Sequence, residues 1–326
     1  MISKETYPGI LFTLFIATLA WIVCLIFPFL NSILIGLLFG IIIGNFFKLP
    51  APFSSGISIS GSKVLEFSIL FLAVGINYTY MGKIGWESFL LVGIVVFLAL
   101  IFSVFLSKKM NCPSTVGWMV GFGTAICGSS AIAALAPSLK NNKEETGIAL
   151  AVVNLFGTLG MLFLPVLIGL FSLSTTEISL LLGGTLHSVG NVAGAAFAVS
   201  DAVGEQAITI KLARVAMLSP GLIFFNFLIR DKSATHNWKN YFQLPWYLWG
   251  FILITIWVSI FPVSDSVLKF SSETGKILLT IAMTAIGLKV SFSALIQSGK
   301  KGLFYGLLIF LFQISLILLG IFFLKN

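Results

Sequence analysis

Long runs of apolar residues, separated by short polar connections, make up most of the chain. Runs of about 17–25 apolar residues are long enough to cross a bilayer as helices. About nine such runs occur, at 8–27, 29–47, 64–81, 86–106, 147–171, 207–229, 245–261, 274–290 and 303–323. Because backbone polar groups in lipid must pair within their own segment, each run predicts a membrane-spanning helix. The pattern therefore predicts an all-α integral membrane protein with about nine full spans.

Two further apolar segments, 114–137 and 177–200, are interrupted by glycine and polar residues. The first reads Gly-Thr-Ala-Ile-Cys-Gly-Ser-Ser at 123–130, and the second reads Gly-Thr-Leu-His-Ser-Val-Gly-Asn at 184–191. A helix that is interrupted at membrane depth leaves backbone groups unpaired, so the interruption must face protein or a water-filled cavity. Two interruptions in one chain are typical of the binding site of a secondary transporter.

The composition excludes a soluble protein, because 58% of residues are hydrophobic, 9% are charged and the mean hydropathy is +1.08. No polar stretch is long enough for a separate domain, so residues 1–326 are expected to form one transmembrane domain. The net charge of +8 is explained by Lys and Arg retained in cytoplasmic loops, and it does not indicate nucleic-acid binding. No Gly-Lys-Ser/Thr phosphate loop is present, so an ion gradient or substrate exchange must drive any transport.

The distribution of Lys and Arg predicts a cytoplasmic N-terminus. If both interrupted segments are re-entrant hairpins, most of the 19 Lys and Arg residues lie inside. If both segments cross the membrane instead, the base-free connection at 172–177 moves inside. The positive-inside rule favours hairpins by that one connection, and both arrangements stay open.

Internal repeats extend beyond the two interruptions. Lys-Val-Leu at 63–65 leads to Ala-Val-Gly-Ile at 73–76, and Lys-Ile-Leu at 276–278 leads to Ala-Ile-Gly-Leu at 285–288. In the hairpin topology both pairs of repeats have opposite orientations, which predicts inverted repeats with a site where they meet at the midplane. The alternative is that small-residue patterns recur by chance in apolar sequence.

The interruptions supply the candidate binding groups for an anion. Helix N-termini carry free N–H groups and a partial positive charge, Ser and Asn cap them, and Gly permits close approach of the backbone. The candidate substrate-binding residues at the two interruptions are Thr124, Cys127, Gly128, Ser129, Ser130, Thr185, His187, Ser188, Gly190 and Asn191. The alternative reading is that these small residues only allow close helix packing.

Charged and titratable residues within apolar segments extend this set. Lys211 and Arg214 share a helical face, and Arg214 is a candidate to bind an oxyanion through two hydrogen bonds, with Asn154 as a polar neighbour; the alternative for Arg214 is a position at the membrane interface. Lys211 is expected at the membrane interface. His187 and Glu66 are candidate proton carriers, although a structural His and a Glu66 paired with a nearby base are the alternatives. No metal site or cofactor is expected, since the three cysteines lack ligand spacing.

Several stretches together resemble one known family. They are the first interruption, Phe-Gly-Thr-Leu-Gly-Met at 156–161 with Pro165, Gly-Thr-Leu-His at 184–187, Ile-Lys-Leu-Ala-Arg-Val at 210–215, and the Gly-Lys, Ala-Met and Gly-Leu-Lys features at 275–289. In these stretches the chain, over about residues 55–300, resembles the YeiH-like sulfate exporter family of bacterial inner-membrane proteins. The resemblance implies a fold related to the cation/proton antiporter and anion transporter superfamily, and a sulfate-like anion as substrate.

We therefore expect a secondary transporter that exports or exchanges a small anion and is not an enzyme, with the lipid bilayer and a second copy of the chain as its other partners. On these grounds Arg214→Ala is expected to weaken anion binding and to leave expression intact. A cation/proton antiporter or an organic-anion symporter of the same fold is the alternative, although the interruptions lack the carboxylates that hold a desolvated cation. An intramembrane hydrolase would need a third group to orient Ser129 or Ser188 with His187, and none is evident.

Overall fold

The computed structural model describes residues 6–27, 30–47, 49–76, 82, 84–110, 112, 114–139, 143–229, 244–290 and 300–325. Every regular element in this part of the chain is a helix. Five helices are long and apolar enough to cross a membrane: Tyr7–Ile26 (α1), the continuous helix Phe53–Ala73, Trp86–Lys109 (α6), Glu144–Ile168 and Lys301–Lys325. The expected all-helical membrane fold with several spans and a broken helix is confirmed.

The other expected spans differ from the prediction in length or continuity. The runs at 29–47 and 245–261 form the 15-residue helices Ser32–Phe46 (α2) and Trp246–Ile260 (α15). The run at 207–229 bends by 45° between Asp201–Ala216 (α12) and Leu218–Ile229 (α13). Pro220, in the first turn of α13, has no N–H for a helical hydrogen bond, which favours a bend at this point.

Both interrupted segments are broken where the sequence indicates. The first consists of Ser114–Ala125 (α7) and Ser129–Leu135 (α8), and Ala136–Ser138 (η3) follows it. The second consists of Thr175–Thr185 (α10) and Val189–Val199 (α11). Lys143–Ile168 (α9) connects the two segments. Residues 77–81 of the run predicted at 64–81 lie outside the described part of the chain.

Two compact units make up the chain. The first comprises the described residues within 1–83, 193–205 and 246–292, and the second those within 84–192, 206–245 and 293–326. In the first unit, Gly40 of α2 packs against Gly287 of Asp265–Lys289 (α16), because a Cβ on either residue would lie 3.0 Å from the other's Cα. Gly9 of α1 and Gly56 of Phe53–Ile59 (α3) make an equivalent approach. Such contacts between small residues are how helices associate in lipid.

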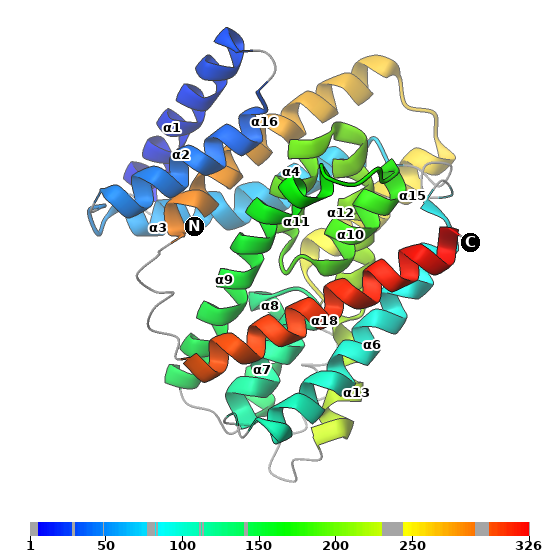
Figure 1. The fold of residues 1–326 in the computed structure, drawn as a ribbon. Coiled ribbons are helices and arrows are strands. Elements are labelled where there is room, and N and C mark those ends of the chain that lie inside the picture. The colour runs from blue at the N-terminus through cyan, green and yellow to red at the C-terminus, as the bar shows by residue number, and fades with distance from the viewer. Residues whose placement is uncertain are drawn as a thin grey trace. The chain divides into compact units, whose positions relative to one another are not determined.

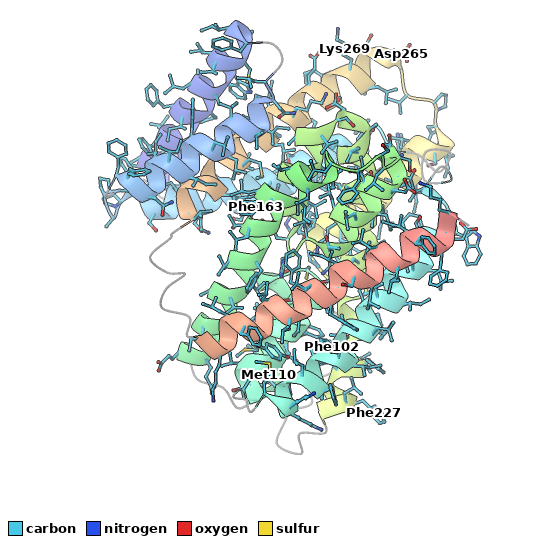
Figure 2. The ribbon with its side chains drawn as sticks, viewed as in Figure 1. Phe102, Met110, Phe163, Phe227, Asp265 and Lys269 are labelled. Atoms are coloured by element: carbon cyan, nitrogen blue, oxygen red, sulfur yellow. The ribbon has the colours of Figure 1, made fainter. Side chains whose placement is uncertain are left out.

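The second unit holds both interruptions, with α7, α8, α10 and the first residues of α11. In it α6 runs alongside Lys300–Lys325 (α18), as Figure 1 shows. The Phe102 ring, labelled in Figure 2, stacks on Phe312 of α18 at a centroid distance of 3.9 Å. Tyr305 Oη donates to the Ser103 carbonyl oxygen at 2.8 Å, which ties α18 to α6 at a second point.

Bulky apolar side chains also cover the outside of the helices. Phe163 and Phe227, labelled in Figure 2, are 59% and 65% exposed. Asp265 and Lys269, which Figure 2 also labels, lie at the start of α16. Exposed aromatic surface along helices with charged ends is what a lipid environment requires. The chain is thus a multi-pass membrane protein.

Candidate functional site

The two interruptions lie against each other within the second unit. Gly128 ends the first interruption with φ +76° and ψ −129°, a backbone conformation that residues with a Cβ rarely adopt. A Cβ at this position would lie 3.5 Å from the carbonyl carbon and oxygen of His187 in the second interruption. The first interruption therefore needs glycine for its backbone angles, and at this point it lies in van der Waals range of its counterpart.

Local hydrogen bonds start and stop the half-helices. In the first interruption the Gly128 N–H donates to the Gly123 carbonyl at 2.8 Å, which closes the end of α7. In the second, Leu186 is extended, and the Ser188 hydroxyl accepts from the Asn191 N–H at 3.1 Å to cap α11. The expected N-cap at Ser188 is confirmed. By contrast, Gly128 caps α8 without a side chain, and the Ser130 hydroxyl donates to Cys127 Sγ at 2.9 Å.

Two buried cationic side chains from α12 join the interruptions. Lys211 Nζ donates to the Ile126 carbonyl at 2.7 Å and to the Leu186 carbonyl at 2.8 Å. Arg214 donates from Nε to Ala125 (2.8 Å), from Nη1 to Gly184 (3.0 Å) and Leu186 (2.8 Å), and from Nη2 to Thr124. Each side chain thus bonds backbone carbonyl oxygens of both interruptions.

The reason for this arrangement is electrostatic. The last carbonyl groups of a helix have no intrahelical partner, and together they carry about half a negative charge. The C-termini of α7 and α10 both lie next to Lys211 and Arg214. These two side chains donate hydrogen bonds to the last carbonyl groups of the two helices. Without the two cations, buried carbonyl groups would be unpaired in a low-dielectric environment, at a cost of several kcal/mol.

This geometry corrects two expectations. Lys211 was expected at the membrane interface, but its exposed fraction is 0%. Lys211 is buried because the Ile126 and Leu186 carbonyls accept hydrogen bonds from its Nζ inside the unit. Arg214 was expected to hold an anion directly, yet its four hydrogen bonds go to backbone carbonyls, so it acts on the interruptions themselves. Arg214→Ala is therefore no longer expected to leave expression intact.

His187 and Gln313 are buried polar side chains beside the interruptions. The His187 ring is 1% exposed, packs on Phe310 at 4.9 Å, and has no hydrogen-bond partner for either nitrogen among the described residues. Gln313 Nε2 of α18 donates to the Gly184 carbonyl at 3.0 Å, which Arg214 also contacts. Gln313 is not among the residues predicted for the site. A polar amide in the middle of a 25-residue apolar span is the signal that identifies it, since such residues are costly in lipid.

The glycines of the Phe-Gly-Thr-Leu-Gly-Met stretch lie against the second interruption. A Cβ on Gly157 of α9 would overlap the Asn191 side-chain amide and lie 3.2 Å from His187 Cβ. A Cβ on Gly160 would lie 2.7 Å from the Phe310 ring and 2.8 Å from the Leu186 side chain. These two glycines therefore allow α9 to approach α18 and the extended backbone around Leu186.

The remaining predicted site residues differ in exposure. Ser129 and Ser130 are exposed and Ser188 is half-buried, so their side chains are accessible from outside the unit. The buried ones are Thr124, Cys127, Gly128, Thr185, Gly190 and Asn191. The Thr185 hydroxyl donates to the Leu181 carbonyl of its own helix at 2.6 Å, which leaves its proton committed there. Asn154 is exposed on α9 and is not among the hydrogen-bond partners of Arg214, so the expected contact is not formed.

Glu66 does not belong to the same unit as the interruptions. It lies in Leu65–Ala73 (α4), where its Oε2 accepts from Lys63 Nζ at 2.8 Å and from Trp246 Nε1 at 2.6 Å. The alternative reading, in which Glu66 pairs with a nearby base, is confirmed. Among the described residues no Asp or Glu is buried, and Lys211 and Arg214 are the charged residues that are.

One solved structure shows a distant likeness to this chain. It is that of the sodium proton antiporter MjNhaP1 from Methanocaldococcus jannaschii at pH 8, with a TM-score of 0.30 and 15% identity. The alignment covers 94% of this chain and 100% of that chain. A likeness of this size carries no argument about transport.

Sequence relatives are similar over nearly the whole chain. The UPF0324 membrane protein YdhF of Lactococcus lactis is 34% identical over 96% of this chain and 97% of its own length. A UPF0324 membrane protein of Lactiplantibacillus plantarum is 30% identical over 93% of each chain. These names describe a membrane protein and specify no substrate. The profile of the family described as Conserved hypothetical protein 698 matches residues 8–306, and the chain belongs to this family.

Proposed function

We propose that the protein is a secondary transporter that exports or exchanges a small anion, with a sulfate-like oxyanion favoured. One observation carries the proposal: two interrupted helices meet at a buried pair of cations, Lys211 and Arg214, and no carboxylate is buried among the described residues. Broken helices at membrane depth are typical of transporter binding sites.

The charge balance at the interruptions favours an anion over a cation. The C-termini of α7 and α10 contribute about half a negative charge each, or about one in total. Two protonated side chains contribute two positive charges, which leaves an excess of about one positive charge. An uncompensated charge away from water is costly, so a small anion that enters this region is stabilised. A cation would instead be repelled by the two fixed positive charges, and no carboxylate is buried among the described residues to offset that repulsion.

In this proposal Lys211 and Arg214 act as fixed charges behind the site, and other groups contact the anion. The exposed hydroxyl of Ser129 supplies a donor from the first interruption, and Ser130, whose proton bonds Cys127 Sγ, would have to turn to supply another. The Ser188 hydroxyl accepts from the Asn191 N–H and supplies its own proton from the second, and a His187 N–H is available because neither ring nitrogen is partnered among the described residues. Oxyanions accept several hydrogen bonds at once, which suits such a group of donors better than a halide does.

We also propose that the protein lies in the bacterial inner membrane with its N-terminus in the cytoplasm, and that it forms a homodimer. The membrane assignment rests on the resemblance to a family of bacterial inner-membrane proteins, and the orientation rests on the distribution of Lys and Arg along the sequence. The homodimer proposal rests on the resemblance to transporter folds in which dimers are common, and cross-linking in membranes tests it.

Thermal unfolding of the purified protein tests the function. Sulfate, sulfite, chloride, a small dicarboxylate and Na⁺ are compared at constant ionic strength over several pH values. A sulfate-like ligand at about 100 times its dissociation constant is expected to stabilise the folded state by about 2.7 kcal/mol. Stabilisation by Na⁺ with no response to any anion would instead support a cation/proton antiporter, and a response to carboxylates alone would support an organic-anion symporter.

A double variant, Ser129→Ala with Ser130→Ala, locates the response. Both side chains are exposed, so their removal is expected to leave the unfolding midpoint nearly unchanged while it weakens stabilisation by the anion. Ser315→Ala is the matched control, because its exposed hydroxyl donates only to the Leu311 carbonyl of its own helix in the described structure. If the anion stabilises the unsubstituted protein, the double variant and Ser315→Ala equally, Ser129 and Ser130 do not belong to the site.

A further inference from the structure

The carbonyl oxygens at the two interruptions are arranged as they are at cation sites of secondary transporters. In such sites unwound carbonyls and half-helix C-termini hold a coupled monovalent cation. Here five carbonyl oxygens from both interruptions converge on the side chains of Lys211 and Arg214; they belong to Thr124, Ala125, Ile126, Gly184 and Leu186. The acceptors that a coupling cation would need already have donors from the protein.

Lys211 resembles a bound monovalent ion more closely than Arg214 does. Its ammonium is a compact point charge at the end of a flexible stem, whereas the guanidinium is an extended planar fork. Lys211 Nζ lies 2.7 and 2.8 Å from one oxygen of each interruption, so it bridges the two as a small ion would.

We propose that the Lys211 ammonium occupies the place of a coupling cation, so that the protein moves its anion without sodium. That the transported ion is an anion rests on the proposed function. The occupied cation site rests on the hydrogen bonds of Lys211 alone. Its consequence is that removal of the ammonium creates a binding site for a small monovalent cation between the Ile126 and Leu186 carbonyls.

The test replaces Lys211 with a residue that leaves space. Lys211→Ser removes the stem and ammonium, and the unfolding midpoint is measured in methylammonium, Na⁺, K⁺ or the bulky cation N-methylglucamine, without any added oxyanion. We expect a lower midpoint than in the unsubstituted protein, with a rise of about 5 °C in a small cation at about 100 times its dissociation constant. N-methylglucamine, which is too large for the space, is expected to have no effect.

Two control variants isolate the site. Lys211→Met fills the space of the stem without a charge, so its midpoint is expected to fall and to stay insensitive to every cation. Lys276→Ser removes a lysine that pairs with Asp201 at 2.7 Å on the exposed part of the first unit, and it should show no cation dependence. If Lys211→Ser is recovered only when it is purified in methylammonium, that result also supports the proposal.

Two results would overturn the inference. One is a folded Lys211→Ser protein whose midpoint is the same in all cations. The other is Na⁺-dependent anion uptake by the unsubstituted protein in proteoliposomes, which decides the matter even if the variant does not fold. Failure of the proposed function looks different, because the unsubstituted protein would then respond to no anion while the cation response of Lys211→Ser would persist.

Discussion

Loss of Arg214 is expected to destabilise the protein strongly, and the structure gives the magnitude. Of the four carbonyls that Arg214 contacts, Gly184 keeps its bond from Gln313 and Leu186 keeps its bond from Lys211. The Thr124 and Ala125 carbonyls have Arg214 as their side-chain donor and lie at the last turn of α7, where intrahelical partners end. Each buried acceptor left unpaired costs about 1–3 kcal/mol, so Arg214→Ala should lose about 2–6 kcal/mol.

The assay is thermal unfolding of the purified protein in detergent, followed by tryptophan fluorescence. At about 2 °C per kcal/mol for a chain of this size, the midpoint should fall by about 4–12 °C. Gln313→Leu is the matched comparison, because the Gly184 carbonyl retains Arg214 and the expected loss is smaller. A midpoint for Arg214→Ala within a degree of the unsubstituted protein, or above that of Gln313→Leu, would refute the reasoning from unpaired carbonyls.

Three further changes test other contacts. Gly157→Ala should lower the free energy of unfolding by about 1–3 kcal/mol, because its Cβ overlaps the Asn191 amide. Gly147→Ala in the same helix has open space around it and should be neutral or stabilising by up to about 1 kcal/mol, and equal effects of the two in thermal unfolding would contradict the packing argument. Ser174→Ala removes a capping box with Glu177 at the start of α10 and should cost about 1 kcal/mol in the same assay. Lys276→Ala breaks an exposed ion pair with Asp201 and should change the midpoint by under about 2 °C, whereas a larger fall would mean that this pair is not a surface contact.

Much of the fold could be predicted because hydrophobic length is a direct requirement of the bilayer. The long apolar helices and both interruptions lie where the residue pattern indicates them, since lipid excludes unpaired backbone whatever the tertiary structure. The bend between α12 and α13 was not predicted, because a proline in an apolar run is compatible with a bend but does not fix its angle. The inverted repeats remain a prediction of the sequence.

The candidate site was harder to predict because its principal acceptors are backbone atoms. The spacing of Lys211 and Arg214 correctly places both on one helical face, but every residue has a carbonyl, so the sequence does not reveal which carbonyls they bind. The burial of Lys211 follows only from the meeting of two helix C-termini. Gln313 was missed for a related reason, since its printed bond also goes to a backbone carbonyl.

This dependence on backbone acceptors changes how selectivity at the interruptions should be understood. A half-helix carries a partial positive charge at its N-terminus and a partial negative charge at its C-terminus. Broken helices alone therefore favour neither anions nor cations. The side chains that neutralise one set of ends decide which ion the other set can attract. Here two basic residues are donors to the C-terminal ends of α7 and α10, and the donors near Ser188 and Ser129 are left without a buried carboxylate nearby in the described chain. In the proposed transporter the sign of the bound ion would therefore depend on residues that need never touch it, and substitutions at Lys211 and Arg214 should alter ion preference and stability together.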